Sequence, residues 1–450
     1  MAYPSSCDSL LPVREFGYHG AHTNSQMIYK NIHNDKSTTY SSLNIKGIPA
    51  FDALNIIQNE LKEDGLTNYD LGSYTTIQML PEADLLIQHS IGKNLVNQNE
   101  YPKTTNIHNN LVKTLANLLH APDADRAFGS STIGSSEAIF LAILAAKWQW
   151  KNRNTGGNPN IVFCSNAHLS WHKFARYLDI ETLEVELDTI NAFPLDKVMK
   201  RIDQDTILVV SILGCTYMGT CDPAQKLNNS LEKLNRENNW DIGIHIDAAI
   251  GGFILPFFRK QQEIWDFKLP LVRSINLSGH KYGLVYPGLG WLLFRDKNYF
   301  KSELSMDSNY LNGHFDSYTV NFSRSSSLVI AQYFNFLHYG FEGYQEIVKK
   351  CTENANLLCI SITDSGYFEV ISDMRLPIVV FKFKENPQFN ISDFTKLLRE
   401  RKWMLPNYQL SGNLTDTVMR VVVRDDMSES TIKLLINDLI DCYVTLDNKL

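Results

Sequence analysis

The stretch Ser278-Gly279-His280-Lys281-Tyr282-Gly283-Leu284 is the part of this chain that decides its fold. It follows a strand-like run at residues 272–277, and an apolar run at residues 242–246 leads directly into Asp247. Runs of this kind are typical of strands in a parallel sheet that is covered on both faces. Because the carboxyl ends of parallel strands meet at one edge, where α/β proteins bind ligands, we expect Lys281 and Asp247 to face one cleft.

A lysine and an aspartate in this arrangement are what pyridoxal phosphate (PLP) chemistry requires of a protein. The lysine forms a Schiff base with the cofactor, and the carboxylate keeps the ring nitrogen protonated, so that the ring can accept electrons. The small Ala249 would let the ring lie flat on the backbone, and His280 would contact the phosphate. Taken alone, Lys281 is more simply a surface lysine in a turn, and Asp247 a helix cap. Together they make a PLP enzyme the leading interpretation.

Four more residues are candidates for the same site. Ser135 and Ser136 begin a strongly helical stretch, where hydroxyl and backbone N–H groups would bind a phosphate. His168 follows an apolar run and is expected to stack on the outer face of the ring, opposite Ala249. Thr216, after another apolar run, is expected to bond the phenolic oxygen of the cofactor or its carboxylate partner. Each also has an ordinary interpretation, as a helix N-cap, a loop histidine or a turn threonine.

Helical patterns alternate with short apolar runs over most of the chain, which predicts an α/β fold with a mainly parallel sheet covered by helices. We predict three parts on this basis. An N-terminal arm or dimerisation segment occupies residues 1–60, a large cofactor-binding domain residues 61–340, and a small C-terminal α/β domain residues 341–450.

The composition is that of a soluble globular protein, with 44% hydrophobic and 20% charged residues. A net charge of −7 argues against nucleic acid as a partner. No apolar run approaches the roughly 20 residues needed to cross a bilayer, and no secretory signal is visible at the start. The seven cysteines are scattered without a CxxC pair, and the histidines form no HExxH motif. We therefore expect reduced thiols, no metal site, no membrane contact and a cytoplasmic location.

Longer segments carry a family likeness that runs from about Asp70 to Arg420. They are Glu100-Tyr101-Pro102, Leu119-His120-Ala121-Pro122, residues 132–138, Trp171-His172-Lys173-Phe174-Ala175-Arg176-Tyr177, residues 245–252, Trp265-Asp266-Phe267, residues 278–282 and Asn321-Phe322-Ser323-Arg324. In this order they resemble the PLP-dependent group II amino-acid decarboxylases, specifically the bacterial and plant glutamate decarboxylases. The resemblance implies an aspartate-aminotransferase-like fold (PLP fold type I) with a seven-stranded-type sheet. It also implies a homodimer with shared active sites, possibly assembled further.

The resemblance also assigns roles to individual residues. It implies that Lys281 is the Schiff-base lysine and that Asp247 pairs with the ring nitrogen, with Thr216 and Ala249 beside the ring. The phosphate would be held by Ser135, Ser136 and His280, and by Ser323 from the second subunit. Tyr310 would return a proton to Cα, assisted by His168, and Arg420 would bind a substrate carboxylate.

The chain departs from the glutamate decarboxylase pattern at the substrate end. His168 stands where those enzymes stack a glutamine, Ser73-Tyr74 replaces a typical Thr-Phe, and Asn97 replaces an aspartate from the neighbouring subunit. Glutamate, with 4-aminobutyrate as product, is therefore the first candidate substrate. The alternatives are a decarboxylase of a non-acidic, aromatic or unusual amino acid, a carbon–carbon lyase or oxidase of the same fold, and a catalytically silent structural homologue.

Overall fold

The computed structural model describes residues 43, 46–153, 156–189, 192–258, 263–300, 306–308, 315–410 and 416–448. The chain divides into one unit that ends at Asp64 and a second that begins at Gly65. The described part of the first unit contains helix α2 (Ala50–Leu61), in which no residue is buried. All elements described below belong to the second unit.

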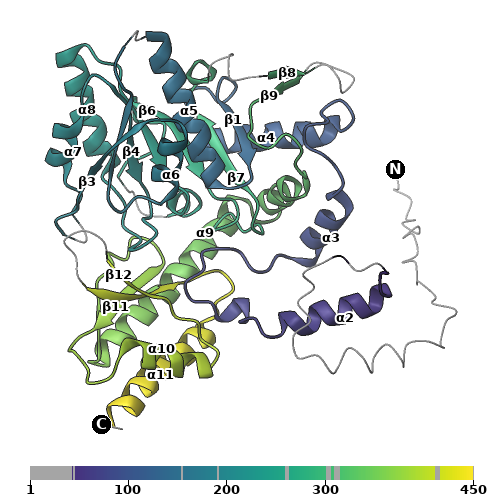
Figure 1. The fold of residues 1–450 in the computed structure, drawn as a ribbon, viewed down its shortest axis with the longest axis vertical. Helices are drawn as coiled ribbons and strands as arrows, with labels where there is room; N and C mark the ends of the chain where they lie inside the picture. The colour runs from purple at the N-terminus through teal and green to yellow at the C-terminus, as the bar shows by residue number, and fades with distance from the viewer. Residues whose placement is uncertain are drawn as a thin grey trace, which may run out of the picture. The chain divides into compact units, whose positions relative to one another are not determined.

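The larger sheet of this unit has seven strands, in the order β1-β7-β6-β5-β4-β2-β3 (Figure 1). The strands are β1 (Phe128–Thr132), β2 (Asn160–Cys164), β3 (Glu181–Val185), β4 (Thr206–Ile212), β5 (Gly243–Asp247), β6 (Val272–Leu277) and β7 (Gly290–Phe294). Strand β7 runs antiparallel to both of its neighbours, and the other pairs are parallel. The predicted α/β fold with a mainly parallel sheet is therefore confirmed.

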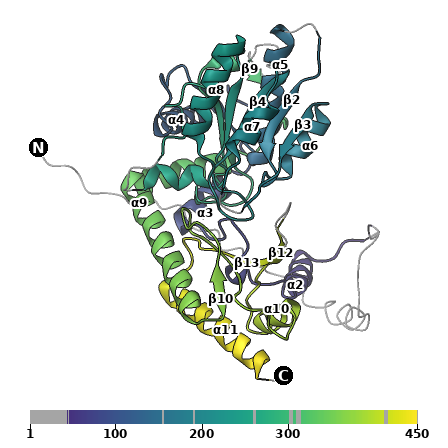
Figure 2. The same ribbon diagram turned by 90° about the vertical axis from the view of Figure 1, so that its left-hand side faces the viewer.

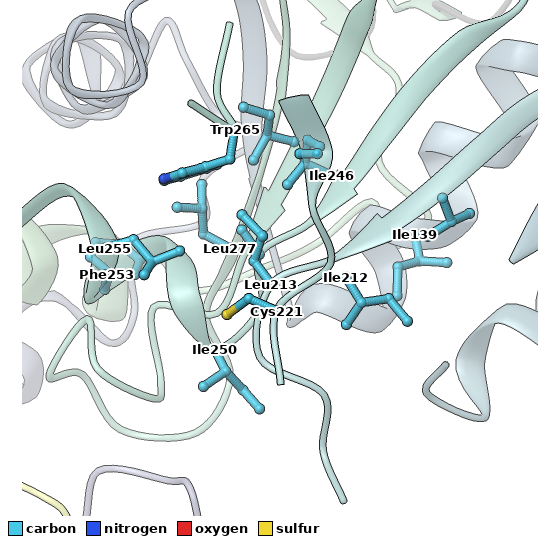
Figure 3. Packing of buried hydrophobic residues seen from close by; sticks show 14 of the residues in the cluster. Ile139, Ile212, Leu213, Cys221, Ile246, Ile250, Phe253, Leu255, Trp265 and Leu277 are labelled. Carbon is cyan, nitrogen blue, oxygen red and sulfur yellow. The ribbon is translucent and has the colours of Figure 1, made fainter. Parts of the chain in front are cut away.

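Helices cover this sheet and bury strands β4, β5 and β6 along their whole length. The helices of this part are α3 (Pro81–Ser90), α4 (Pro102–Leu118), α5 (Ser135–Arg153), α6 (Ser170–Tyr177), α7 (Leu195–Arg201) and α8 (Ala224–Asn238), with short 3₁₀ turns η1 (Thr67–Tyr69), η2 (Gly251–Phe253), η3 (Leu255–Phe257) and η4 (Lys297–Tyr299). Figure 3 shows Ile139 of α5, Ile246 of β5 and Leu277 of β6 in the resulting core. This core supports the ends of the strands from which the candidate site residues project.

The second sheet is antiparallel, has the order β10-β11-β13-β12 and packs with its own hydrophobic core. Its elements are β10 (Phe368–Val370), β11 (Ile378–Phe383), α10 (Ile391–Glu400), β12 (Asn407–Gln409), β13 (Thr417–Val422) and α11 (Glu429–Asp447). A short pair, β8 (Met306–Ser308) and β9 (Phe315–Ser317), stands apart from both sheets.

Helix α9 (Ser327–Asp364) connects the two parts, because it contacts α3 and α4 as well as β10, β11 and α11 (Figure 2). It bends at Gly340, whose φ of 56° is one that a side chain would disfavour. The proposed boundary between the large and small domains falls at this bend, and the three-part division remains a prediction. Over the described residues, no helix is both long and apolar enough to cross a membrane.

Candidate active site

A cavity of about 660 Å³ lies where β4, β5 and β6 end and α5 begins. Its lining includes residues that were predicted from the sequence to form the site, namely Ser135, Ser136, His168, Thr216, Asp247, Ala249, His280 and Lys281. These residues come from five separate stretches of the chain, each at the end of a strand or the start of a helix. The shared sheet edge is what brings them into one cleft.

The backbone carbonyls of Lys281 and Gly283 accept hydrogen bonds from side chains that lie outside the turn at residues 278–284. The hydroxyl of Thr76 donates to the Lys281 carbonyl at 2.8 Å. Two buried side chains of α9, Gln332 and Tyr344, donate to the carbonyl of Gly283 at 2.9 and 3.0 Å. The main chain that carries the amine is therefore fixed by a segment before the sheet and by the connecting helix. Such support limits the positions that a reactive side chain can take.

The carboxylate of Asp247 is buried and accepts three hydrogen bonds. Its Oδ1 accepts from the side-chain amide of Asn276 at 3.0 Å and from the backbone N–H of Ala249 at 3.2 Å. Its Oδ2 accepts from the indole N–H of Trp171 at 2.9 Å. All three partners are donors, and together they hold the carboxylate in one orientation at the edge of the cavity.

The ring of His168 lines the same cavity and carries its proton on Nε2. Its Nδ1 accepts the backbone N–H of Ser170 at 3.2 Å and lies 2.8 Å from the hydroxyl of that residue. Burial lowers the pKa of His168, and the positive charge of Lys281 adds to this effect while Asp247 opposes it. The lowered pKa favours the neutral imidazole, which is compatible with stacking on an aromatic ring.

Hydroxyl groups gather at the start of α5. Ser135 and Ser278 lie 2.8 Å apart, and Ser136 and Ser170 lie 2.9 Å apart, measured between their Oγ atoms. His280 donates through Nδ1 to the Leu289 carbonyl at 2.8 Å, and burial lowers its pKa to about 4. A bound phosphate would favour the protonated ring, which carries a second N–H group at Nε2. Together with the N-terminus of a 19-residue helix, these groups form a binding site for an anion.

Tyr74 lies between Lys281 and the arginine that was expected to bind substrate. The Nζ atom of Lys281 is 5.2 Å from the ring centroid of Tyr74, and the Cζ atom of Arg420 is 4.8 Å from it. The phenol donates to the Thr216 carbonyl at 2.8 Å. Arg420 donates to the same carbonyl and to that of Gly72. These two bonds use one N–H group on each terminal nitrogen of the guanidinium. Its Nε atom is buried without a partner among the described residues, so the donors left for an anion are the remaining N–H groups of the terminal nitrogens.

The groups around the cavity match the parts of PLP. The amine of Lys281 can react with the aldehyde, and the carboxylate of Asp247 can pair with the ring nitrogen. The serine hydroxyls at the start of α5 can bind the phosphate. The three groups line one cavity. The donor set therefore fits this cofactor.

Comparison with known proteins agrees with this fit. The profile of the pyridoxal-dependent decarboxylase conserved domain matches residues 70–384, more than half of the chain. The chain belongs to the pyridoxal-dependent decarboxylase family. It is a carboxy-lyase, and its cofactor is pyridoxal 5′-phosphate.

Relatives of this decarboxylase include two enzymes and one solved structure. It is 42% identical over 402 residues to a glutamate decarboxylase of Petunia hybrida, covering 87% of this chain and 80% of the relative. It is 40% identical over 386 residues to a glutamate decarboxylase of Lactococcus lactis, covering 83% of each. The structure of the Lactobacillus brevis glutamate decarboxylase superposes with a TM-score of 0.88 at 37% identity, covering 93% of this chain and 97% of that one.

Some residues that the sequence selected do not line the cavity of the decarboxylase. Ser73 bonds Thr75 through its hydroxyl at 2.7 Å, and Tyr74, Asn97 and Arg420 also lie outside the lining. Ser323 is exposed, and its hydroxyl accepts from the side chain of Asn94 at 3.2 Å. Tyr310 lies outside the described residues. The roles expected for these residues therefore remain predictions.

Sequence reasoning missed the residues that surround Asp247. Trp171 was quoted only as part of a family segment, and Asn276 was not selected at all. A signal was present in the strand at residues 272–277, where polar side chains interrupt an otherwise apolar run that is buried throughout. A polar group in such a strand needs a buried partner, and Asp247 is that partner.

The rate at which the cofactor-free decarboxylase binds PLP covalently should depend on pH, because it depends on the protonation state of the Lys281 amine. Burial lowers the pKa of this amine to about 8, against the ordinary value of 10.5; Asp247 opposes the shift and Arg420 adds to it. Since only the neutral amine attacks an aldehyde, the rate should rise with pH and level off above a midpoint near 8. Stopped-flow absorbance on cofactor-free protein measures this.

Two charge variants check the cause of that midpoint. Arg420→Met removes a positive charge and should move the midpoint to higher pH, whereas Asp247→Asn removes a negative charge and should move it to lower pH. A midpoint near 10.5 in the unmodified protein would show that the amine is not desolvated.

Proposed function

We propose that this decarboxylase converts L-glutamate to 4-aminobutyrate and carbon dioxide. The observation that carries the proposal is the position of Arg420, a cation held next to the ring of Tyr74, which in turn adjoins the Lys281 amine. An amino acid attached near Lys281 would extend a side-chain carboxylate toward this cation. The relatives named glutamate decarboxylase over most of the chain support the same substrate.

The residues of the cavity would divide the chemistry among them. Lys281, whose pKa is lowered, would supply the neutral amine that holds the cofactor and that the substrate amine would replace. Asp247 keeps the ring nitrogen protonated, while His168 and Ala249 would enclose the ring from its two sides and Thr216 would bond its polar edge. When bound, PLP supplies the electron sink for the pair left on Cα as the bond to the α-carboxylate breaks. A proton then takes the place of the carboxylate.

The two ends of the site would orient the substrate. Ser135, Ser136 and His280 would hold the phosphate at the start of α5 and so fix the position of the cofactor relative to the substrate. Arg420 would bind the distal carboxylate with the N–H donors that the carbonyls of Thr216 and Gly72 leave free. Binding at both ends would orient the α-carboxylate bond for cleavage.

A second subunit would complete the site. We propose that Ser323 binds the cofactor phosphate in the site of the second subunit. Its exposed position, outside the cavity of its own chain, agrees with this role. Ser73 and Asn97 would contribute to recognition at the substrate entrance, and Tyr310 would return the proton to Cα. We propose on these grounds a homodimer, and we place it in the cytoplasm because the cysteines among the described residues are free thiols. The alternatives of another amino-acid substrate or a silent homologue are not favoured by the relatives.

The substrate proposal is tested by measuring carbon dioxide release from the purified protein with each of the twenty amino acids. We expect glutamate to give the highest kcat/KM and 4-aminobutyrate to appear in equal amount to the gas. Aspartate is the matched comparison, because it carries the same charge on a side chain one methylene shorter. A higher kcat/KM with any non-acidic amino acid would contradict the proposal.

A further inference from the structure

A chain of buried hydrogen bonds leads away from Asp247 into the sheet. Asn276 donates to Asp247 and lies 2.7 Å from Nε2 of His245 through its Oδ1 atom. The other ring nitrogen of His245 lies 2.7 Å from the hydroxyl of Ser274. His245 and Asn276 are completely buried and Ser274 is 2% exposed. None of the three lines the cavity.

The direction of each bond in this chain is determined by chemistry. An ionised carboxylate only accepts, so Asn276 must point its NH₂ group at Asp247 and its oxygen at His245. The Nε2 atom of His245 must then carry the proton. Burial lowers the pKa of His245, so the ring is neutral and its bare Nδ1 accepts from Ser274. One arrangement satisfies every donor and acceptor along the chain.

A count of acceptor sites on Asp247 identifies the oxygen that remains available. A carboxylate offers about four acceptor sites, two on each oxygen. Oδ1 already accepts from Asn276 and from the backbone of Ala249. Oδ2 accepts only from Trp171 among the described residues. One site on Oδ2 is therefore left for a further donor.

We propose that Trp171 and the chain Ser274–His245–Asn276 position Asp247 so that Oδ2 presents this last site to the ring nitrogen of the cofactor. The inference rests on the role proposed for Asp247 and deepens it. These are positioning residues, since they act through the carboxylate. The rings of Trp171 and His245 also contact each other edge to face, with their centroids 5.1 Å apart, so each ring limits the movement of the other.

The proposal is tested by comparing two ligands on cofactor-free protein: PLP and its 1-deaza analogue, in which CH replaces the ring nitrogen. Both keep the aldehyde and the phosphate, and they differ only where Asp247 acts. Equilibrium dialysis gives the two dissociation constants. The unaltered protein should prefer PLP by about 10- to 100-fold, as expected for a hydrogen bond between charged groups.

Two variants test the positioning residues Trp171 and His245. Trp171→Phe keeps an aromatic ring and removes the donor to Oδ2, and His245→Leu keeps a similar volume and removes the link to Asn276. Each should lower the preference for PLP about 10-fold, as loss of an outer hydrogen bond does at metal ligands, and leave the affinity for the analogue unchanged. Ser211→Ala is the matched control, because Ser211 is a buried residue of β4 whose hydroxyl has no partner among the described residues.

The possible outcomes distinguish a failure of this inference from a failure of the role proposed for Asp247. An equal loss of affinity for both ligands in Trp171→Phe and His245→Leu would mean that these residues only support the fold, and an unchanged preference would mean that they do not act through Asp247. Either result overturns the inference. If the unaltered protein shows no preference, the pairing of Asp247 with the ring nitrogen is itself wrong, and so is the role proposed for it.

Discussion

Lys281→Ala is expected to reduce carbon dioxide release from glutamate by about six orders of magnitude, a loss comparable to that caused by removing a catalytic nucleophile. It should also remove the visible absorbance of the lysine-bound cofactor. The reason is structural, since Lys281 is the only lysine among the described residues that line the cavity. Absorbance spectra and a gas-release assay on the purified variant give both results.

Two controls make the lysine result specific. Lys268→Ala removes an exposed lysine before β6 and should change neither the spectrum nor the rate. Methylamine added to Lys281→Ala should restore part of the activity, because the vacated space can admit a small amine. A variant that keeps its visible absorbance without added amine would contradict the assignment of Lys281.

Asp247→Asn is expected to lower kcat by about 10³- to 10⁴-fold, as does the loss of a key charged or hydrogen-bonding group at other active sites. Asparagine is the same size, but it carries no charge to keep the ring nitrogen protonated. Its NH₂ group would also face either the indole N–H of Trp171 or the donors from Asn276 and Ala249. Steady-state kinetics with saturating glutamate and cofactor measure the loss.

A second buried carboxylate provides the comparison for Asp247. Asp266 is 8% exposed, lies outside the cavity lining and pairs with His120 at 2.6 Å. Asp266→Asn should lower thermal stability while kcat stays close to that of the unaltered protein. Equal losses of kcat in the two variants would indicate a general effect of burying an amide, rather than a task specific to Asp247.

The sequence predicted the parallel sheet and the cavity residues for the same physical reason. Asp247 ends a strand, and His168, Thr216 and Lys281 each lie a few residues after one. Strand ends share an edge regardless of the details of packing. The antiparallel direction of β7 was not foreseen, because a short apolar run carries no information on direction.

Contacts that depend on register could not be read from the sequence. Asn276 meets Asp247 because the two are partners in the pairing of β5 with β6, which is shifted between Ile244 and His245. Such a shift is decided by packing over the whole sheet. Arg420 reaches the backbone of Thr216 from β13 of the second sheet, a contact that no local pattern encodes.

Gln332 and Tyr344, which hold the carbonyl of Gly283, stand on opposite sides of the bend in α9 at Gly340. The next carbonyl, that of Leu284, is held by Asn335 of the same helix at 2.7 Å, although leucine rarely adopts its φ of 63°. Helix α9 therefore reaches the main chain that follows Lys281 from both of its segments, and it also contacts strands β10 and β11 of the second sheet. Because the donors to these two carbonyls lie before and after Gly340, the angle of the bend determines whether they can reach the turn together, although Gly340 itself does not line the cavity.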